Sequence, residues 1–444
     1  MKKQPWLALI GLCLVSFLGC IDFTIVNTAL PDMQKDLAVS ATTLQWVISG
    51  FLLALSALMI LSGRIADIHG RKKYVIAATI LFGFASLGAG LSTDITWLII
   101  FRILQGVAIA VLYTIPMAII MNIFDEQYRH KAGGILIGVN GFGLAIGPVL
   151  GGCILAISNW HWIFYINIPF VILGLLILIP TLPETFSHEH GNKIDWLGGL
   201  LLVILLPVII FAIMQGADAG WFTVTNIVLY IITIFSAICF YLAEKHTKSP
   251  IILFHMFRSH QYIVSNVAMI ALAFFYTADF FLLPLYLHQI KQLSGFYIGL
   301  YLLPAPLLVA IISPFNDKLI KIFGCKKLMS AGFLLFFLSA IAQWFITPYS
   351  SVLYIVFTLV LFGLGWSIIL TPAVIYGLSA LPNSISGVAM GSLCSLHNYG
   401  GVIGLVIAAA LFAKFNFAAA LIPLMIIALV TLFIIAIFHS KVKT

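Results

Sequence analysis

The chain has 444 residues, of which 62% are hydrophobic and only 8% are charged. A soluble globular domain carries about 25% charged residues, so this composition excludes a soluble enzyme and indicates a protein of the lipid bilayer. The formal net charge of +8 does not indicate a nucleic-acid partner, because Lys and Arg form short clusters between apolar runs and no basic stripe.

The apolar runs are continuous and do not alternate with polar residues, which indicates membrane-spanning helices and not the strands of a barrel. A helix needs about 20 residues to cross the hydrocarbon core. Charged residues and turn signals divide the chain into fourteen runs of roughly that length. In chain order, the predicted spans are 6–30, 44–63, 74–91, 97–121, 132–157, 162–182, 196–215, 221–243, 262–287, 295–316, 328–346, 350–376, 385–412 and 417–438.

The first of these runs is similar to a cleaved lipoprotein signal, because two lysines precede an apolar stretch that ends at Cys20. The stretch continues past Cys20 to Leu30, which makes it long enough to cross a bilayer. We therefore expect an uncleaved first span.

Basic residues concentrate on one side of the predicted spans. With the N-terminus inside, all 22 Lys and Arg residues fall in inner segments except Lys35, Arg102, Lys291 and Lys414. Positively charged segments between spans stay on the cytoplasmic side, so both termini are expected in the cytoplasm. This pattern predicts a multi-pass protein of the inner, or plasma, membrane of the cell.

The chain also repeats, with a period of 254 residues. The turns at 63–73 (GRIADIHGRKK) and 317–327 (DKLIKIFGCKK) carry a glycine and two lysines in the same register. The alternative is chance similarity between two short basic turns. A parallel repeat predicts two related six-helix bundles. We therefore expect an N-terminal bundle at 1–182, two inserted helices with flanking cytoplasmic loops at 183–261, and a C-terminal bundle at 262–444.

Several segments resemble a known family in the order in which they occur. The turn at 63–73 resembles the signature loop of the major facilitator superfamily, and GLAIGPVLGG (143–152) resembles the fifth-helix motif of its drug–proton antiporters. The segments DFTIVNTALP, RILQG and WHWIFYINIP, together with the inserted helices, are similar to its fourteen-span branch. The resemblance covers nearly the whole chain. It implies an all-α membrane protein of the major-facilitator type, with multidrug efflux driven by protons as its expected activity.

The turn at 63–73 is a candidate cytoplasmic gating loop. Gly63 and Gly70 permit a tight turn and a close approach of helices. Asp67 can pair with Arg71 or cap a neighbouring helix end, and breaking that latch would bias inward-facing against outward-facing states. The alternative is a basic loop that only sets the topology.

Gly143, Gly147 and Gly151 recur every four residues in the fifth predicted span, so they line one face of a helix. Small residues at this spacing let two helices pack backbone to backbone, and Pro148 adds a local hydrogen-bond defect. We expect a packed face at the junction of the two bundles that seals the path when the cavity is closed. The alternative is packing without a role in gating.

Three formally charged residues lie well inside predicted spans: Asp22, Arg102 and Asp279. Charge inside the bilayer is costly unless it is paired or hydrated. Asp22 and Asp279 lie in equivalent helices of the repeat and are expected to face a shared central cavity, where a carboxylate can hold a proton or a cationic substrate. The resemblance ties an arginine at position 102 to proton coupling. The alternatives are a structural hydrogen bond for each carboxylate and a static ion pair for Arg102.

His397 is the only histidine deep in a span, at a place where relatives in the family often carry arginine. It is a candidate for coupling or binding, or else a packing histidine. Phe275, Tyr276 and Phe280 lie around Asp279 and are candidate cavity aromatics for apolar cations. Aromatic rings in a bilayer helix usually meet lipid or neighbouring helices, which is the alternative for these three. His161 stands where the family usually has arginine.

These features predict a proton-coupled antiporter that exports small amphiphilic or cationic drug-like compounds by alternating access. The alternative is an exporter of one endogenous metabolite, such as a siderophore or an organic acid. The sequence contains no nucleophile–base constellation of the kind that an enzyme would need. It also contains no Walker-type phosphate loop, which counts against an ATP-driven pump. The isolated cysteines indicate no metal site. No cofactor is expected beyond the proton as coupling ion, and the sequence does not specify whether a periplasmic adaptor and an outer-membrane channel take part.

Overall fold

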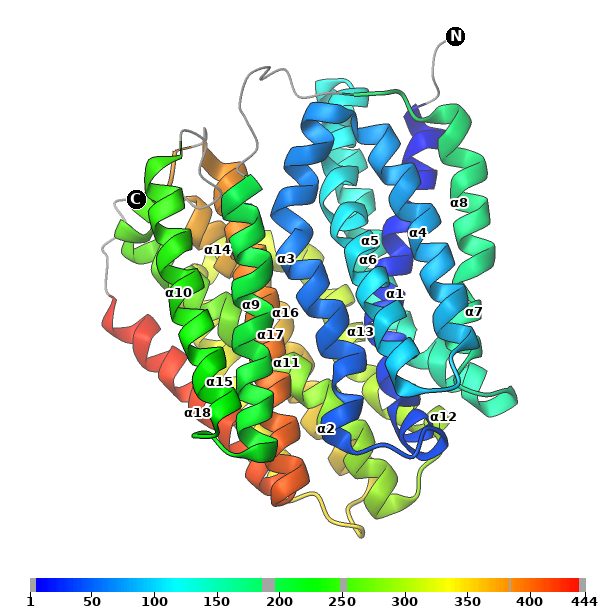
Figure 1. The fold of residues 1–444 in the computed structure, drawn as a ribbon, viewed down its shortest axis with the longest axis vertical. Coiled ribbons are helices and arrows are strands. Elements are labelled where there is room, and N and C mark those ends of the chain that lie inside the picture. Colours follow the sequence, from blue (N-terminus) through cyan, green and yellow to red (C-terminus); the bar gives the residue numbers. More distant parts are fainter. Residues whose placement is uncertain (1–4, 186–195, 248–253, 383–384, 439–444) are drawn as a thin grey trace. The chain divides into compact units, whose positions relative to one another are not determined.

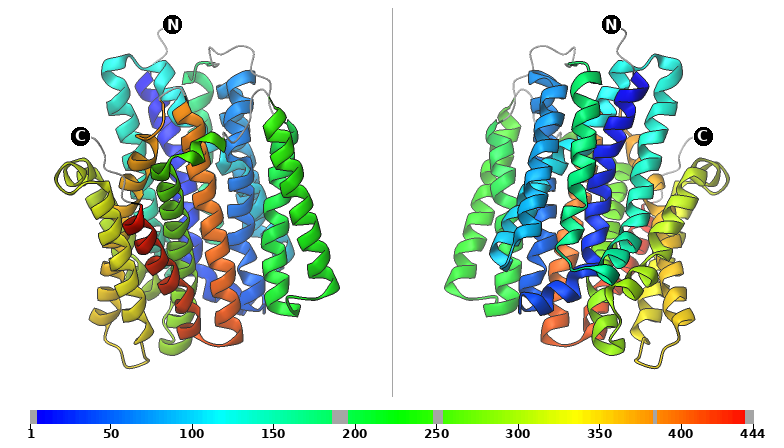
Figure 2. Two further views of the ribbon diagram at one scale, coloured as in Figure 1. Left: turned by 90° about the vertical axis from the view of Figure 1, so that its left-hand side faces the viewer. Right: turned by 90° about the vertical axis from the view of Figure 1, so that its right-hand side faces the viewer.

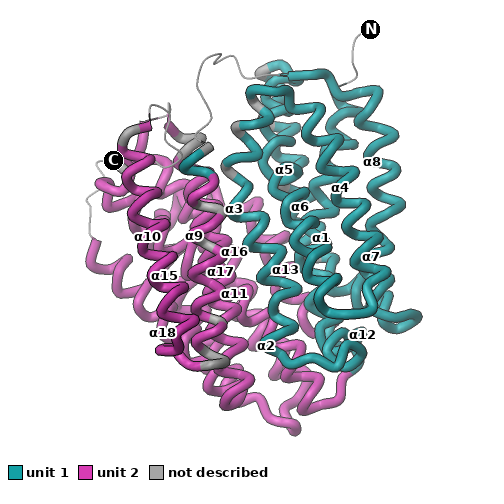
Figure 3. Tube along the Cα trace, viewed as in Figure 1, with its two compact units in different colours: residues 1–199, 294–299 teal, residues 200–293, 300–444 magenta. Residues whose placement is uncertain are grey.

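The computed structural model describes residues 5–185, 196–247, 254–382 and 385–438, and these residues form helices and turns without a β-strand (Figure 1). Two compact units share the chain (Figure 3). Unit 1 comprises residues 1–199 and 294–299. Its helices are α1 (Pro5–Asp36), α2 (Ala41–Leu44), α3 (Trp46–His69), α4 (Arg71–Leu91), α5 (Ile95–Ile123), α6 (Glu126–Ile157), α7 (Trp162–Tyr165) and α8 (Asn167–Thr181).

Unit 2 comprises residues 200–293 and 300–444. It takes in most of α9, while α12 is divided between the two units. The helices from here to the end of the chain are α9 (Trp196–Ala219), α10 (Val224–His246), α11 (His260–Lys291), α12 (Gly295–Leu302), α13 (Pro304–Ile312), α14 (Asn316–Phe323), α15 (Cys325–Trp344), α16 (Val352–Leu378), α17 (Ser386–Lys414) and α18 (Phe417–Ile437), with short 3-10 turns at Phe254–Arg258 and Ser313–Phe315.

The described residues contain thirteen helical segments that are long and apolar enough to cross a membrane. This result confirms a multi-pass helical membrane protein. The remaining predicted span, 196–215, coincides with α9, which is helical but is not one of the thirteen segments. The count of fourteen spans and the division at 182 and 262 therefore stay predictions.

Two predicted spans are broken in the structure. The span at 162–182 divides into α7 and α8 at Ile166, and the span at 295–316 divides into α12 and α13 at Leu303. A proline lies just after each break, at positions 169 and 304. Proline has no backbone N–H and its ring clashes with the carbonyl of the preceding turn, which explains why each span does not continue as one helix.

Each unit is organised around one central helix. In unit 1, α1 packs against α5, α6 and α8, while α4 packs against both α5 and α8 (Figures 1 and 2). In unit 2, α11 packs against α16, α17 and α18, while α15 packs against both α16 and α18. The same set of neighbours recurs in the same chain order, which is what a parallel repeat requires.

The two basic turns of the repeat share an unusual backbone. Gly70 separates α3 from α4 with φ +106°, and Gly324 separates α14 from α15 with φ +79°. Residues with a Cβ rarely adopt such angles. Most of each predicted turn is nevertheless helical, because α3 continues to His69 and α14 to Phe323, so the chain reverses at the glycine alone.

The helices α9 and α10 form an antiparallel hairpin (Figure 2). Along α10, large apolar side chains such as Ile231, Ile234, Phe235 and Ile238 are exposed. A face of this kind is stable only in contact with lipid or another apolar surface. The hairpin therefore contributes little to the buried core that the other helices of unit 2 build around α11.

Replacing Gly70 with alanine is expected to destabilise the protein by about 1–3 kcal/mol, the cost of holding a residue with a Cβ at a sparsely populated backbone angle. The added Cβ would also lie 2.6 Å from Glu184 Oε1. Gly63 is a matched control in the same loop, because it is helical and no atom lies within 4 Å of a Cβ there. Thermal unfolding in detergent measures both variants. Equal midpoints for Gly70→Ala and Gly63→Ala would show that the positive φ does not matter.

Candidate functional site

An ion pair between Asp22 of α1 and Arg102 of α5 lies at the centre of unit 1. The side chains are 0% and 1% exposed. A guanidinium has five donors in a planar fork, and Arg102 uses this geometry twice more: Nε donates to the Val47 carbonyl at 2.9 Å, and Nη1 donates to Gln105 Oε1 at 2.8 Å. An ion pair was the alternative to a coupling role for Arg102, and the structure places its guanidinium beside the Asp22 carboxylate.

Three uncharged polar residues complete this cluster. Gln105 donates from Nε2 to Asp22 Oδ1 at 3.2 Å and to Ser86 Oγ at 2.8 Å. Asn167 of α8 donates to the same two oxygens, at 3.4 and 3.3 Å. We define the Asp22 cluster as Asp22, Ser86, Arg102, Gln105 and Asn167. All five are buried, and they come from α1, α4, α5 and α8.

The Asp22 cluster satisfies the carboxylate on both oxygens, and Phe51 of α3 places its ring 4.3 Å from the Arg102 guanidinium carbon. A buried ion pair is stable only when further hydrogen bonds satisfy both partners. The arrangement therefore gives the Asp22 carboxylate both a counter-ion and a hydrogen-bond donor on each oxygen. Ser86, Gln105 and Asn167 were not predicted from the sequence, because uncharged polar residues are common inside spans. Gln105 did carry a signal, since it lies one helical turn after Arg102 and shares its face.

Asp279 of α11 lies in unit 2 and has a very different environment. It is 1% exposed, and Oδ2 accepts a hydrogen bond from Gln343 Nε2 of α15 at 3.2 Å. No described residue donates to Oδ1, and Asp279 forms no ion pair with a described residue. Asp22 and Asp279 thus find their partners in different units. The predicted shared cavity is not tested by these contacts and stays a prediction.

His397 of α17 contacts two groups on α11. Nδ1 lies 2.9 Å from the Met269 carbonyl, which can only accept, so Nδ1 carries a proton. Nε2 lies 3.5 Å from the Tyr276 hydroxyl, within hydrogen-bond distance. The structure therefore brings together two residues that the sequence singled out separately, with the imidazole held between a carbonyl and a phenol.

The three aromatic residues around Asp279 pack within unit 2. Tyr276 stacks on Trp366 with ring centroids 4.7 Å apart and an interplanar angle of 5°. Phe275 stacks on Phe336 at 4.3 Å, and Phe280 lies edge-on to Trp366 at 5.9 Å. Their rings are buried against α15 and α16. This is the alternative in which aromatic rings meet neighbouring helices, and the predicted cavity role stays a prediction.

The predicted gating loop is bound to other helices of unit 1. Arg71 is buried and its Nη1 donates to the Ala118 carbonyl of α5 at 3.3 Å. The backbone N–H of Lys72, in the first turn of α4, donates to Glu184 Oε1 at 2.9 Å. An acidic side chain at this end of a helix is stabilised by the unpaired N–H groups and the helix dipole. Glu184 was not predicted from the sequence. The Asp67 side chain lies outside the described part of the chain, so its latch stays a prediction.

The glycine face of α6 packs against α1. A Cβ at Gly143 would lie 2.8 Å from the Phe17 ring, one at Gly147 would overlap the Thr24 hydroxyl, and one at Gly151 would overlap the Thr28 hydroxyl. Small residues here let the two backbones approach closely. The face thus packs inside unit 1, on the side of α1 opposite to Asp22.

The next positions on α6 contact the start of α12, which also belongs to unit 1. A Cβ at Gly152 would lie 3.0 Å from the Phe296 backbone, and one at Gly299 would overlap the Pro148 carbonyl oxygen. Proline at 148 leaves α6 helical. The predicted sealing role of this segment in gating stays a prediction.

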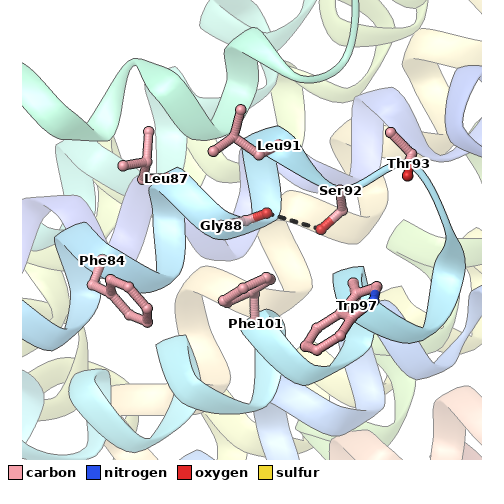
Figure 4. Close-up of a pocket in the computed structure, with 8 residues that line it drawn as sticks. All are labelled: Phe84, Leu87, Gly88, Leu91, Ser92, Thr93, Trp97 and Phe101. Atoms are coloured by element: carbon pink, nitrogen blue, oxygen red, sulfur yellow. Dashed lines mark hydrogen bonds between the residues drawn. The ribbon is translucent and has the colours of Figure 1, made fainter.

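A cavity of about 250 Å³ lies between α4 and α5. The rings of Phe84, Phe101 and Trp97 lie along one edge of it, and Leu87 and Leu91 lie along the other (Figure 4). Its remaining lining residues are Gly88, Ser92 and Thr93. No ionisable side chain lines the cavity, and Phe84, Leu91 and Trp97 are exposed. Such a surface fits the lipid-facing side of the unit and not a site for proton exchange.

The sequence matches the family model described as Major Facilitator Superfamily over residues 12–404. Multidrug resistance protein Stp of Mycobacterium tuberculosis (strain CDC 1551 / Oshkosh) is 29% identical over 411 residues, which cover 92% of this chain and 76% of Stp. Riboflavin transporter RibZ of Clostridioides difficile (strain 630) is 28% identical over 413 residues, which cover 93% of this chain and 89% of RibZ.

Among solved structures, a POT family transporter in complex with 5-aminolevulinic acid gives a TM-score of 0.74 at 15% identity. The match covers 98% of this chain and 96% of that transporter. At this level of identity, the likeness establishes the fold and nothing about the ligand.

Removing either partner of the Asp22–Arg102 pair is expected to destabilise the protein by about 3–5 kcal/mol, because one buried charge then has no counter-ion. The double variant Asp22→Asn/Arg102→Met buries no uncompensated charge, so its cost is expected to fall well below the sum of the two single costs. Unfolding free energies of the wild type and the three variants in detergent measure this coupling. Additive costs would contradict the ion pair.

Replacing Gly147 with alanine is expected to destabilise the protein by about 1–3 kcal/mol, because the methyl group would push α6 away from Thr24. Gly141 lies on the same helix with no atom within 4 Å of a Cβ, and alanine there is expected to stabilise the protein by up to about 1 kcal/mol, because alanine favours a helix over glycine. The difference between the two melting temperatures is the measurement. A Gly147→Ala protein as stable as Gly141→Ala would rule out close packing of α6 on α1.

Proposed function

This chain belongs to the Major Facilitator Superfamily, and we propose that it is a fourteen-span antiporter that exports small amphiphilic or cationic compounds in exchange for protons. Membership makes it a membrane transporter with a small-molecule substrate. The substrate class is supported by the likeness to multidrug resistance protein Stp over 92% of the chain. Transport proceeds by alternating access, with both termini in the cytoplasm, as the placement of Lys and Arg favours.

Proton coupling is supported by one observation above the others. Asp22 and Asp279 are almost fully buried in the central helices α1 and α11, but only Asp22 forms an ion pair with a described residue. A buried carboxylate without a counter-ion must gain a proton or a cation to be stable. Asp279 is such a group, and a proton and a cationic substrate can therefore compete for it. One charge that moves down a potential of about 100 mV releases about 2.3 kcal/mol, so inward proton flow can drive export without ATP.

The other candidate residues take supporting roles in this proposal. Arg102 holds Asp22 ionised, and His397 adjusts the hydrogen bonding of Tyr276 beside Asp279. The loop with Gly63, Asp67, Gly70 and Arg71 regulates closure on the cytoplasmic side. The α6 segment with Gly143, Gly147, Pro148 and Gly151 keeps the opposite side closed while the cytoplasmic side is open.

Transport of one endogenous metabolite is the second candidate function. The observation that favours it is the similarity to riboflavin transporter RibZ, which covers 93% of this chain at an identity close to that of Stp. Riboflavin is a neutral aromatic molecule and would need no counter-charge from Asp279. Under this alternative, cells with the protein and cells without it would accumulate different amounts of riboflavin. The same two kinds of cell would accumulate equal amounts of a lipophilic cation.

Everted membrane vesicles that are acidified inside are expected to lose protons when a cationic dye substrate is added, because each substrate cation that enters displaces protons outward. A lumenal pH indicator records the change, and vesicles from cells that lack the protein are the control. Dye accumulation is expected to stop when an ionophore collapses the proton gradient. Accumulation that continues without any proton gradient would refute proton-coupled antiport.

A further inference from the structure

The hydrogen bonds around Asp279 leave two oxygen atoms without a donor. Gln343 Nε2 donates to Asp279 Oδ2 at 3.2 Å. Neither Asp279 Oδ1 nor Gln343 Oε1 has a hydrogen-bond partner among the described residues. The residues are 1% and 0% exposed, so bulk water does not satisfy these atoms. Two buried acceptors without donors are costly, and they lie on two side chains that already contact each other.

The orientation of the Gln343 amide follows from its second neighbour. Ser339 Oγ lies 2.8 Å from the Thr358 carbonyl, which can only accept, so the hydroxyl proton of Ser339 points there. Ser339 Oγ can therefore only accept from the Gln343 amide, at 3.4 Å. The amide nitrogen of Gln343 therefore faces Ser339 and Asp279 Oδ2. The amide oxygen is the atom without a hydrogen-bond partner among the described residues.

A proton on Asp279 Oδ1 would turn this atom into a donor, which is the group that Gln343 Oε1 lacks. A protonated carboxyl group donates one hydrogen bond and accepts others, while an amide donates from nitrogen and accepts at oxygen. The two groups are thus complementary as a carboxylic acid and a carboxamide, and the structure already contains one of their two hydrogen bonds. A metal ion fits poorly, because a hard cation such as Ca²⁺ takes about 6–8 oxygen ligands, and Asp279 and Gln343 offer two oxygens without a donor among the described residues.

Asp22 offers no such place for a proton. Both of its oxygens accept hydrogen bonds, from Arg102 on one side and from Gln105 and Asn167 on the other. A proton on either Asp22 oxygen would make that oxygen a hydrogen-bond donor. The proton would then face the N–H groups of Arg102 or of Gln105 and Asn167, which are themselves donors. The Asp22 cluster is therefore suited to a carboxylate that stays ionised throughout transport.

We propose that Asp279 and Gln343 form a carboxylic acid–carboxamide pair that is the proton-binding site of this transporter, and that Asp22 is not one. The exchange of this proton for substrate rests on the function proposed above, whereas the binding of the proton does not. When the proton leaves, Asp279 becomes a buried carboxylate with no cation beside it, and a cationic substrate supplies the missing charge. Gln343 is a positioning residue, since its amide orients the carboxyl group and shares the proton.

Infrared difference spectroscopy tests the site directly, because a protonated carboxyl group has a C=O stretching band that an ionised one lacks. At neutral pH and without substrate, the purified protein is expected to have this band. Asp279→Asn is expected to lose it completely, while Asp22→Asn keeps it. Gln343→Leu is expected to keep the band at a higher frequency, because the carboxyl group loses hydrogen bonds. Asn266→Ala is the matched control: its amide is buried on α11, the helix of Asp279, and donates to the Tyr262 backbone carbonyl.

Three results would overturn the proposal: a band that persists in Asp279→Asn, a band lost in Asp22→Asn, or a band that sodium ions remove at constant pH while potassium ions do not. If Asp279→Asn does not fold, the frequency of the band in Gln343→Leu decides, and an unchanged frequency counts against the pair. Failure of drug–proton exchange is distinguishable from these results. In that case the band behaves as expected without substrate, but vesicles release no protons when substrate is added.

Discussion

Charge inside a lipid bilayer persists only where an opposite charge and enough hydrogen-bond donors surround it. The Asp22–Arg102 pair meets both conditions, and the arrangement of unit 1 provides them. α1 supplies the carboxylate, α5 the guanidinium and one amide, α8 a second amide, α4 a hydroxyl and α3 an aromatic ring. The other side of α1 contacts the glycine face of α6. A shift of α6 along α1 would therefore act on the same helix that holds the ion pair.

Unit 2 repeats the helix arrangement but not the charge compensation. Its central helix carries Asp279 at a position three residues from the one equivalent to Asp22, yet an amide replaces the guanidinium as its partner. The repeat thus contains one carboxylate that is neutralised by a fixed cation and one that is not. In the proposed function, this difference separates two tasks: the first carboxylate stabilises the bundle, and the second changes its charge during transport.

The sequence predicted the helices well because an apolar run long enough to cross a bilayer has few other stable conformations. It left an ion pair of Arg102 with a carboxylate open as an alternative, since three charges inside spans leave few choices. The two helix breaks could have been predicted from Pro169 and Pro304, but the predicted spans were drawn as continuous helices across both positions. Ser86, Asn167, Gln343 and Glu184 could not be predicted, because uncharged residues in spans and an acidic residue in a loop are common, and only the packing of helices distant in sequence selects them.

The most direct test of the account is the flux reversal point of the purified protein in liposomes. With a cationic substrate on both sides, one measures the substrate gradient at which net flux stops, as the pH difference is varied at a fixed membrane potential. The account predicts that this gradient shifts with the pH difference in the wild type and is independent of it in Asp279→Asn. A reversal point in the wild type that does not depend on pH would contradict the account.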